Sequence, residues 1–223
     1  MSNKKINIAI DGPSGVGKTI MANMLANKLG YKFISSGTLY RTIAYNALKN
    51  NINLANEEAI NKAWNIKDLF ITEDDKIILN NEDITLKIRE DKVSQAASSI
   101  AKFSSIREKV NKFIQKLGED KKGIIVDGRD ATYRILPNAE VKFFLWASPE
   151  IRADRRVKQD LELGINSNYK DILQSIKERD YNDMHRDIDP LKVSEGSIEI
   201  DTSNLSIEEN FKVMYDEVMK RLK

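Results

Sequence analysis

The sequence has no cysteine and a single histidine, His185. These absences exclude disulfides, thiolate metal sites, catalysis by a thiol and any metal centre built from several histidines. Long apolar runs are missing too: no segment reaches the length that crosses a bilayer, and the N-terminus has no apolar core of a signal peptide. We therefore expect a cytoplasmic protein without a membrane partner.

The sequence also lacks a large excess of charge of either sign. It has 36 lysine and arginine residues and 34 aspartate and glutamate residues, for a net charge of +2. This balance argues against a surface dominated by attraction to nucleic acid or to an anionic membrane. Hydrophobic residues make up 41% of the chain and charged residues 31%, as in ordinary globular proteins. A chain of 223 residues can bury a full core, and we expect one domain over residues 1–223.

What the sequence does contain is a glycine-rich phosphate-binding motif between a strand and a helix. An apolar run at residues 6–10 predicts a buried strand, the pattern G-x-x-x-x-G-K-[ST] follows at residues 12–19, and a helix is expected over residues 18–29. Such a loop turns its backbone N–H groups toward a phosphate, and the helix dipole favours the same anion. Lys18 would reach the β- and γ-phosphates, and the Thr19 hydroxyl would ligate Mg²⁺. The motif predicts a nucleoside triphosphate site formed by Gly12, Pro13, Ser14, Gly15, Val16, Gly17, Lys18, Thr19 and Ile20.

Strands and helices alternate along most of the chain, which predicts an α/β fold with a central parallel sheet flanked by helices. Ser148 and Pro149 have the character of a helix start, and Ser206 with Glu209 matches a capping box for the last helix. Further strands are expected at residues 32–34, 123–127, 141–147 and 197–201, and a second helix at residues 38–50.

One stretch breaks this alternation. Two short β-like runs at residues 69–72 and 76–79 are separated by the acidic residues 73–75, and a third run can follow the Asn80-Asn81 turn. This pattern predicts a small insertion that contains a hairpin, rather than another β-α unit. A single long helix is expected after it, over residues 91–117.

Several arginines lie at positions where they could bind the phosphate of an acceptor. Guanidinium groups suit this role because they bind phosphate in a bidentate way and stay charged. Asp127 and Arg129 follow a predicted parallel strand, and open sheets bind ligands at the carboxyl ends of such strands. Arg41 falls within the predicted helix 38–50. Asp127 has two comparable interpretations, as a holder of the metal's water shell or as a helix-capping acid.

Two other groups of arginines have an alternative interpretation as charges on the protein surface. Arg179, Asp183 and Arg186 are spaced i, i+4 and i+7, which would place them on one face of a helix, but a surface ion-pair ladder has the same spacing. The chain contains no N-K-x-D, which disfavours a regulatory GTPase. Three more arginines share a face of the helix after residue 148, and taken alone they are expected to be solvated: Arg152, Arg155 and Arg156.

Together these motifs resemble the bacterial cytidylate kinases, a family of nucleoside monophosphate kinases, over nearly the whole chain. Beyond the loop at residues 12–19, the matching blocks occur in the family's order: Ser36-Gly37 with Tyr40-Arg41; residues 81–85 with Ile88-Arg89; Ala96-Ala97-Ser98; Arg107-Glu108; Asp127-Gly128-Arg129-Asp130; and residues 147–150, 177–191 and 201–209. The resemblance implies a P-loop kinase fold with a β-containing insertion that binds the nucleoside monophosphate, at about residues 62–103, and a helical lid at about residues 152–187.

The resemblance also implies transfer of the γ-phosphoryl group of ATP to CMP or dCMP by a monomeric enzyme, with Mg²⁺. The acceptor is a phosphate oxygen that is already ionised at neutral pH, so in-line transfer needs no general base. By similarity, Lys18, Arg129, Arg186 and Arg155 would be catalytic, and Thr19 with Asp127, the latter through water, would hold the metal. The acceptor site would use Arg41, Arg129 and Arg186 for the phosphate, Ser98, Arg107 and Asp130 for the cytosine edge, and Arg179 and Asp183 for the sugar, with Ser36 and Tyr40 packed nearby.

The sequence departs from the family's pattern after Asp130. Residues 131–134 replace a small Ile-Gly-Thr-Val-like run and add Tyr133 and Arg134 beside the acceptor residues. CMP and dCMP both stay open as acceptors. Two other classes would share the first motif, namely a different P-loop small-molecule kinase, directed at UMP or shikimate, and a non-catalytic nucleotide-sensing module. The groups around Arg129 and Arg186 argue against both.

Overall fold

The computed structural model describes residues 5–65, 68–72, 76–120, 122–162 and 164–222, and its contacts divide the chain into two units. The first unit comprises Met1–Ser35 and Ile114–Lys223, and the second comprises Ser36–Phe113. The second unit therefore interrupts the first in the sequence, and it contains the whole of the insertion expected at residues 62–103.

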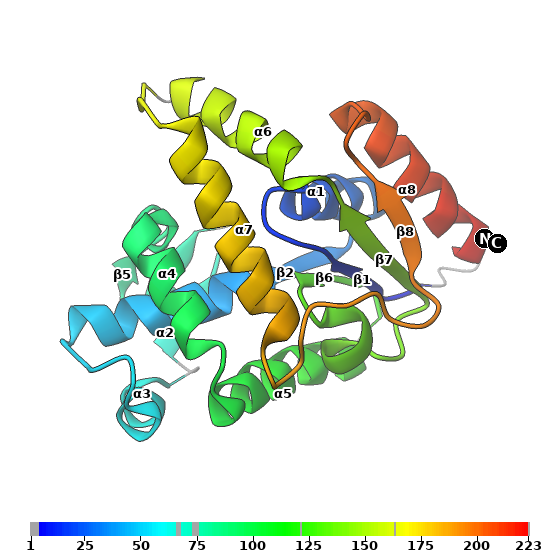
Figure 1. Ribbon diagram of the computed structural model, residues 1–223. Coiled ribbons are helices and arrows are strands. Elements are labelled where there is room, and N and C mark those ends of the chain that lie inside the picture. The colour runs from blue at the N-terminus through cyan, green and yellow to red at the C-terminus, as the bar shows by residue number, and fades with distance from the viewer. Residues whose placement is uncertain (1–4, 66–67, 73–75, 121, 163, 223) are drawn as a thin grey trace. The chain divides into compact units, whose positions relative to one another are not determined.

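A parallel sheet of five strands forms the centre of the first unit, as the alternation of strands and helices predicts (Figure 1). Because all the strands run parallel, their carboxyl ends lie at one edge, where open α/β sheets bind ligands. Central β1 pairs with β6 in a register that places Asp11 beside Gly128. The strand order is β2-β6-β1-β7-β8, with β1 at Ile8–Asp11, β2 at Lys32–Ser35, β6 at Ile124–Gly128, β7 at Val141–Trp146 and β8 at Ile198–Asp201.

One face of this sheet is covered by the first and last helices of the chain, α1 at Lys18–Leu29 and α8 at Ile207–Leu222. Alternate residues of a strand point to the same face, so Ile8 and Ile10 of β1 enter this core together with Phe143 of β7. Each is fully buried, and burying a side chain of this size contributes roughly 1.5–3 kcal/mol. Residues of α1 belong to the same core, which therefore packs α1 against β1.

The helix ends follow the signals in the sequence. Gly30 closes α1 in a left-handed conformation, with φ of 65°. Ser206 and Glu209 form the predicted capping box, in which the Glu209 N–H donates to Ser206 Oγ and the Ser206 N–H donates to Glu209 Oε2. The Ser148 hydroxyl oxygen accepts a bond from Ile151 N, 3.3 Å away, at the start of the next helix.

Two further helices of the first unit, α6 at Pro149–Glu162 and α7 at Tyr169–His185, lie side by side (Figure 1). Asn168 caps α7 by accepting bonds from Lys170 N and Asp171 N. His185 is exposed at the end of α7, where it stacks on Tyr181. None of the helices in the described ranges is long and apolar enough to cross a membrane.

The second unit combines helices with a small antiparallel sheet, as expected for the insertion. The turn at residues 73–75 lies outside the described residues, whereas Asn80 and Asn81 form the second turn, with φ of 50° and 64°. Asparagine tolerates this left-handed region better than most residues. The elements are α2 at Ser36–Lys49, α3 at Glu57–Ala63, β3 at Leu69–Ile71, β4 at Ile77–Leu79, β5 at Glu82–Asp83, a 3₁₀ helix at Lys87–Arg89, α4 at Asp91–Ile100, and α5 at Ser104–Asp120, which continues into the first unit.

The prediction of one helix over residues 91–117 is wrong, because the chain breaks between α4 and α5. Two contacts stabilise the break, one with a residue far away in the sequence and one between residues close together in the sequence. The carboxylate of Glu57 accepts a bond from Ser105 N at the start of α5, 3.1 Å away. The Arg107 guanidinium donates to the carbonyl of Ala101, just after α4, at 3.0 Å. Unsatisfied groups at both helix ends thus find partners that the local periodicity does not reveal.

Gly12, which follows β1, provides a test of how tightly the loop is built. Its φ is 147°, and a Cβ added there would lie 2.0 Å from the carbonyl oxygen of Leu145 in β7. We expect Gly12→Ala to lower the free energy of unfolding by about 3 kcal/mol, because backbone must move. Gly17→Ala is the matched control, since φ is 92° there but nothing lies within 4 Å of the added Cβ. It should cost about 1–2 kcal/mol. Equal losses in urea unfolding would contradict the prediction.

Candidate active site

The loop at residues 12–19 connects the carboxyl end of β1 to the start of α1 (Figure 1). Gly15 and Gly17 have φ of 83° and 92°, a region that favours glycine, and Gly17 is the residue that caps α1. A helix start of this kind presents unpaired backbone N–H groups and the positive end of the helix dipole. The loop therefore has the geometry that the motif predicts for binding an anion.

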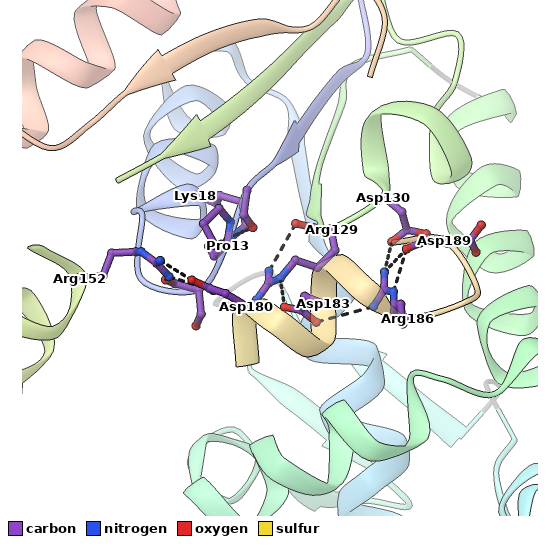
Figure 2. A network of polar contacts seen from close by, with 12 residues as sticks. Pro13, Lys18, Arg129, Asp130, Arg152, Asp180, Asp183, Arg186 and Asp189 are labelled. Atoms are coloured by element: carbon purple, nitrogen blue, oxygen red, sulfur yellow. Dashed lines mark hydrogen bonds and ion pairs between the residues drawn. The ribbon is translucent and has the colours of Figure 1, made fainter. Parts of the chain in front are cut away.

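Lys18 is turned back into this loop. Its ammonium group donates to the carbonyl oxygens of Gly12 and Pro13, at 2.7 and 2.6 Å, and the side chain is buried (Figure 2). Burial lowers the pKa of Lys18 well below its ordinary value, and the nearby charge of Arg129 adds to this, while Asp127 opposes it. An anionic ligand at the loop would offset the cost of keeping this charge buried.

Thr19 and Asp127 meet at the same edge of the sheet. The Thr19 hydroxyl donates to Asp127 Oδ2 at 2.7 Å, although the two residues come from α1 and β6. Among the described residues, no cluster of three or more His, Cys, Asp or Glu side chains is placed to hold a metal ion. A hydroxyl with one carboxylate nevertheless fits Mg²⁺, which takes one or two protein oxygens and completes its shell with water and substrate phosphates.

Arg129 and Asp183 form an ion pair just beyond β6. Arg129 Nε lies 2.7 Å from Asp183 Oδ2, and both side chains are largely buried (Figure 2). Burial works to raise the pKa of Asp183, but the guanidinium groups of Arg129, Arg179 and Arg186 outweigh it and hold that pKa below its ordinary value. The carboxylate thus stays ionised and fixes Arg129. Arg179 lies one turn before Asp183 on α7.

Arg186 is the residue that ends α7, and its backbone is extended, with ψ of 144°. Arg186 therefore lies near Asp183, as the spacing predicts, but in the capping position just after the last helical residue. Its side chain still returns to the same cluster: the carbonyl of Asp189 accepts from Nε at 2.8 Å, and the carboxylates of Asp130 and Asp183 each lie 3.8 Å away (Figure 2).

Arg152 is not solvated, contrary to expectation: its side chain is 2% exposed. Its guanidinium pairs with the buried Asp180 of α7 through two contacts, and it also donates to the carbonyls of Ala147 and Ser14 at 2.9 and 3.0 Å (Figure 2). A buried guanidinium needs such a full set of acceptors. One side chain therefore connects the loop at residues 12–19, the end of β7 and the helix α7.

Arg155 lies on the same helix and faces another segment. Its guanidinium donates to the hydroxyl of Thr202 at 3.2 Å and to the carbonyls of Thr202 and Ser203. Thr202 directly follows β8. Arg155 is thus at the carboxyl edge of the sheet, as a catalytic role requires, but none of these contacts links it to Arg129 or Arg186.

Asp11, at the end of β1, is a functional candidate that sequence reasoning missed. Its fully buried carboxyl group accepts bonds from Ala131 N and Thr132 N, both at 2.8 Å, and from the Thr132 hydroxyl at 2.5 Å. Burial raises the pKa of Asp11 to about 6, and the nearby Asp130 adds to this, against the effect of the hydrogen bonds from Thr132 and Ala131. A polar residue at the end of a buried strand was the available signal.

The other predicted acceptor residues belong to the second unit. Ser36, Tyr40 and Arg41 lie in the first turns of α2, and Arg41 donates to the Thr38 hydroxyl at 3.2 Å. Ser98 lies on α4, which packs against α2. Arg107, on α5, is 2% exposed, and its guanidinium lies 5.7 Å from the centre of the Tyr40 ring. The structure thus gathers these five residues into one unit.

Comparison with known proteins gives one consistent family. A family model described as cytidylate kinase matches residues 8–220. A cytidylate kinase from Mycoplasmopsis synoviae is 46% identical over 92% of this chain and 94% of its own length, and one from Bacillus subtilis is 43% identical over 92% and 93%. A solved structure of an uncharacterized protein from Eubacterium ventriosum covers 97% of this chain and 99% of its own, with 15% identity and a TM-score of 0.56. That likeness shows the fold alone.

The carboxyl group of Asp11 leads to a specific pH dependence. Its pKa is about 6 in the folded protein against an ordinary 3.8, so in between the folded state keeps a proton that the unfolded state loses. The contribution of this group to the free energy of unfolding is fully present below about pH 4. It falls by roughly 3 kcal/mol as the pH rises through about 6. In urea unfolding, we expect the advantage of the wild type over Asp11→Asn to shrink by about 2–3 kcal/mol across this range. Parallel pH profiles would contradict the assignment.

Proposed function

Because the chain belongs to the cytidylate kinase family, its reaction is the transfer of the γ-phosphoryl group of ATP to CMP or dCMP, and we propose how its residues perform that transfer. The observation that supports this most is the meeting of two groups at the carboxyl edge of one sheet: the loop at residues 12–19 with Lys18, and the Arg129–Asp183–Arg186 cluster. The first group suits a nucleoside triphosphate, and the second suits a phosphorylated acceptor.

On the donor side, residues 12–20 would surround the phosphates of ATP. The backbone N–H groups at the start of α1 and the ammonium of Lys18 supply the positive charge. Thr19 and Asp127 would hold Mg²⁺, Thr19 directly and Asp127 through water. When bound, Mg²⁺ neutralises negative charge on the phosphates.

On the acceptor side, Arg129 and Arg186 would bind the phosphate of CMP, and Arg41 of the second unit would take part. Both guanidinium groups of the first unit are already held by carboxylates and a carbonyl, so few rotamers are lost on binding. Arg179 and Asp183 would bind the sugar hydroxyls. Ser98, Arg107 and Asp130 would recognise the cytosine edge, since a carboxylate accepts from the exocyclic amine that uracil lacks.

In the transfer, an oxygen of the CMP phosphate forms a bond to the γ-phosphorus while the bond from that phosphorus to the bridging oxygen of ADP breaks. The attacking oxygen is already ionised, so no residue has to remove a proton. The residues contribute alignment and electrostatic stabilisation, which is what a loose transition state requires. Arg155 stays a predicted catalytic residue in this scheme, and the cytoplasmic location and monomeric state stay predictions.

The acceptor is tested directly by a substrate panel. We expect ADP release with CMP and dCMP to exceed that with UMP, AMP or shikimate, because the proposed contacts recognise both a phosphate and a cytosine edge. A coupled assay over the five acceptors measures this. Preference for UMP or shikimate would instead favour the alternative of a differently directed P-loop kinase.

The acceptor residues are tested by substitution. We expect Arg129→Ala and Arg186→Ala each to lower kcat/KM for CMP by about 100-fold or more, since removing one positioned donor costs on the order of 2.7–4 kcal/mol in transition-state energy. Binding of an ATP analogue should change far less. Arg221→Ala, at an exposed position near the end of α8, is the matched control. Near-normal CMP turnover in both variants would overturn the assignment.

A further inference from the structure

Residues 131–135 form one turn of π helix after Asp130. The first four of them, residues 131–134, are where the sequence departs from the family's pattern. The turn is anchored on one side to the core: Ala131 N and Thr132 N donate to the buried carboxyl group of Asp11. The side chain of Gln115 on α5 also donates to the carbonyl of Arg134 at 3.0 Å. The backbone of this turn is therefore a fixed support, and π turns of this kind often occur at functional sites.

On its other side, the turn holds the segment that follows α7. The Tyr133 hydroxyl donates to the carbonyl of Pro190 at 2.5 Å, and Arg134 Nε lies 3.5 Å from Asp189 Oδ1. Burial raises the pKa of Tyr133 above its ordinary value, so the hydroxyl keeps the proton that it donates. Lys192 places its ammonium 4.7 Å from the centre of the Tyr133 ring.

The segment held in this way carries the carbonyl that orients Arg186. The Asp189 carbonyl oxygen accepts from both Nε and Nη2 of Arg186 (Figure 2). Asp189 has φ of 48°, a left-handed conformation that persists in a non-glycine residue only where its surroundings enforce it. The next residues return to α7, where Leu191 N donates to the carbonyl of Asp183 at 2.8 Å.

We propose that Tyr133 and Arg134 are positioning residues of this enzyme: by holding residues 189–190 they keep the Asp189 carbonyl where it fixes the guanidinium of Arg186. The proposal rests on the acceptor role proposed above for Arg186. Tyr133 contributes most, because its hydroxyl bond is shielded by a half-buried ring. The Arg134 side chain is 59% exposed, and its ion pair contributes little.

The first experiment removes the hydroxyl alone. We expect Tyr133→Phe to lower kcat/KM for CMP about tenfold, mainly through kcat, since a displaced catalytic group loses rate steeply with distance. The KM for ATP should not change. Arg134→Gln should lose about twofold in the same constant. Tyr31→Phe is the matched control, because it also removes a hydrogen-bonded hydroxyl, the one that accepts from Ile6 N at 3.1 Å. Its Tm should also fall, because the Ile6 N–H loses its partner, while its kinetics stay those of the wild type.

The second experiment is a double-mutant cycle between positions 133 and 186. If Tyr133 acts through Arg186, Tyr133→Phe should cost nothing further in the Arg186→Ala background. Wild-type CMP kinetics of Tyr133→Phe, or losses that simply add in the double variant, would overturn the proposal. The single variant separates the two hypotheses: normal CMP kinetics of Arg186→Ala would refute the acceptor role itself, whereas a large loss there with additive effects refutes only the positioning role.

Discussion

The positive charges at the carboxyl edge of the sheet are held by oxygen atoms of the protein itself. Lys18 donates to backbone carbonyls of its own loop, Arg129 pairs with Asp183, and Arg152 pairs with Asp180 while also donating to the carbonyl of Ser14. Burying a cation without such partners costs far more than any one of these bonds returns. The need to match each cation therefore fixes the loop, α6 and α7 with respect to β1. Groups that stabilise developing charge are most effective when they are already oriented, so the same constraint suits the roles proposed for these residues in phosphoryl transfer.

Asp11 connects the phosphate loop to the segment that follows Arg129 and Asp130. It is the last residue of β1, so the phosphate loop follows it directly in the chain. Its carboxyl group also holds Ala131 and Thr132, which come directly after Arg129 and Asp130. The phosphate loop and the residues proposed to bind the acceptor thus share, within the first unit, a frame of one strand and a few hydrogen bonds. The cost is a carboxyl group kept where its charge is disfavoured, as its raised pKa shows.

Local sequence patterns predicted the strands, helices and loop of this site, but they did not predict which distant residues contact them. The loop at residues 12–19, the strands and the helix caps follow from residue types a few positions apart, and the structure confirms them. The break between α4 and α5 could not be predicted in this way, since it depends on Glu57, which is far away in the sequence. The burial of Arg152 was missed for a similar reason: helical spacing shows which residues share a face, but not that Asp180 of another helix covers that face. The carbonyl acceptor of Arg186, which belongs to Asp189, lies beyond the end of α7, where helical spacing predicts no contact.

The position of β1 in the sheet has a consequence for synthesis of the chain. β1 pairs with β6 on one side and β7 on the other, and both partners follow the whole of Ser36–Phe113 in the sequence. Contacts of such long separation form late, whereas the second unit can fold from residues that are already together. The nucleotide-binding loop therefore emerges from the ribosome long before it has a sheet to rest on. A chain released before β7 is made lacks both β7 and α8, which contribute Phe143 and Met214 to the core around Ile8 and Ile10. Apolar surface then stays exposed, which favours aggregation of such a chain.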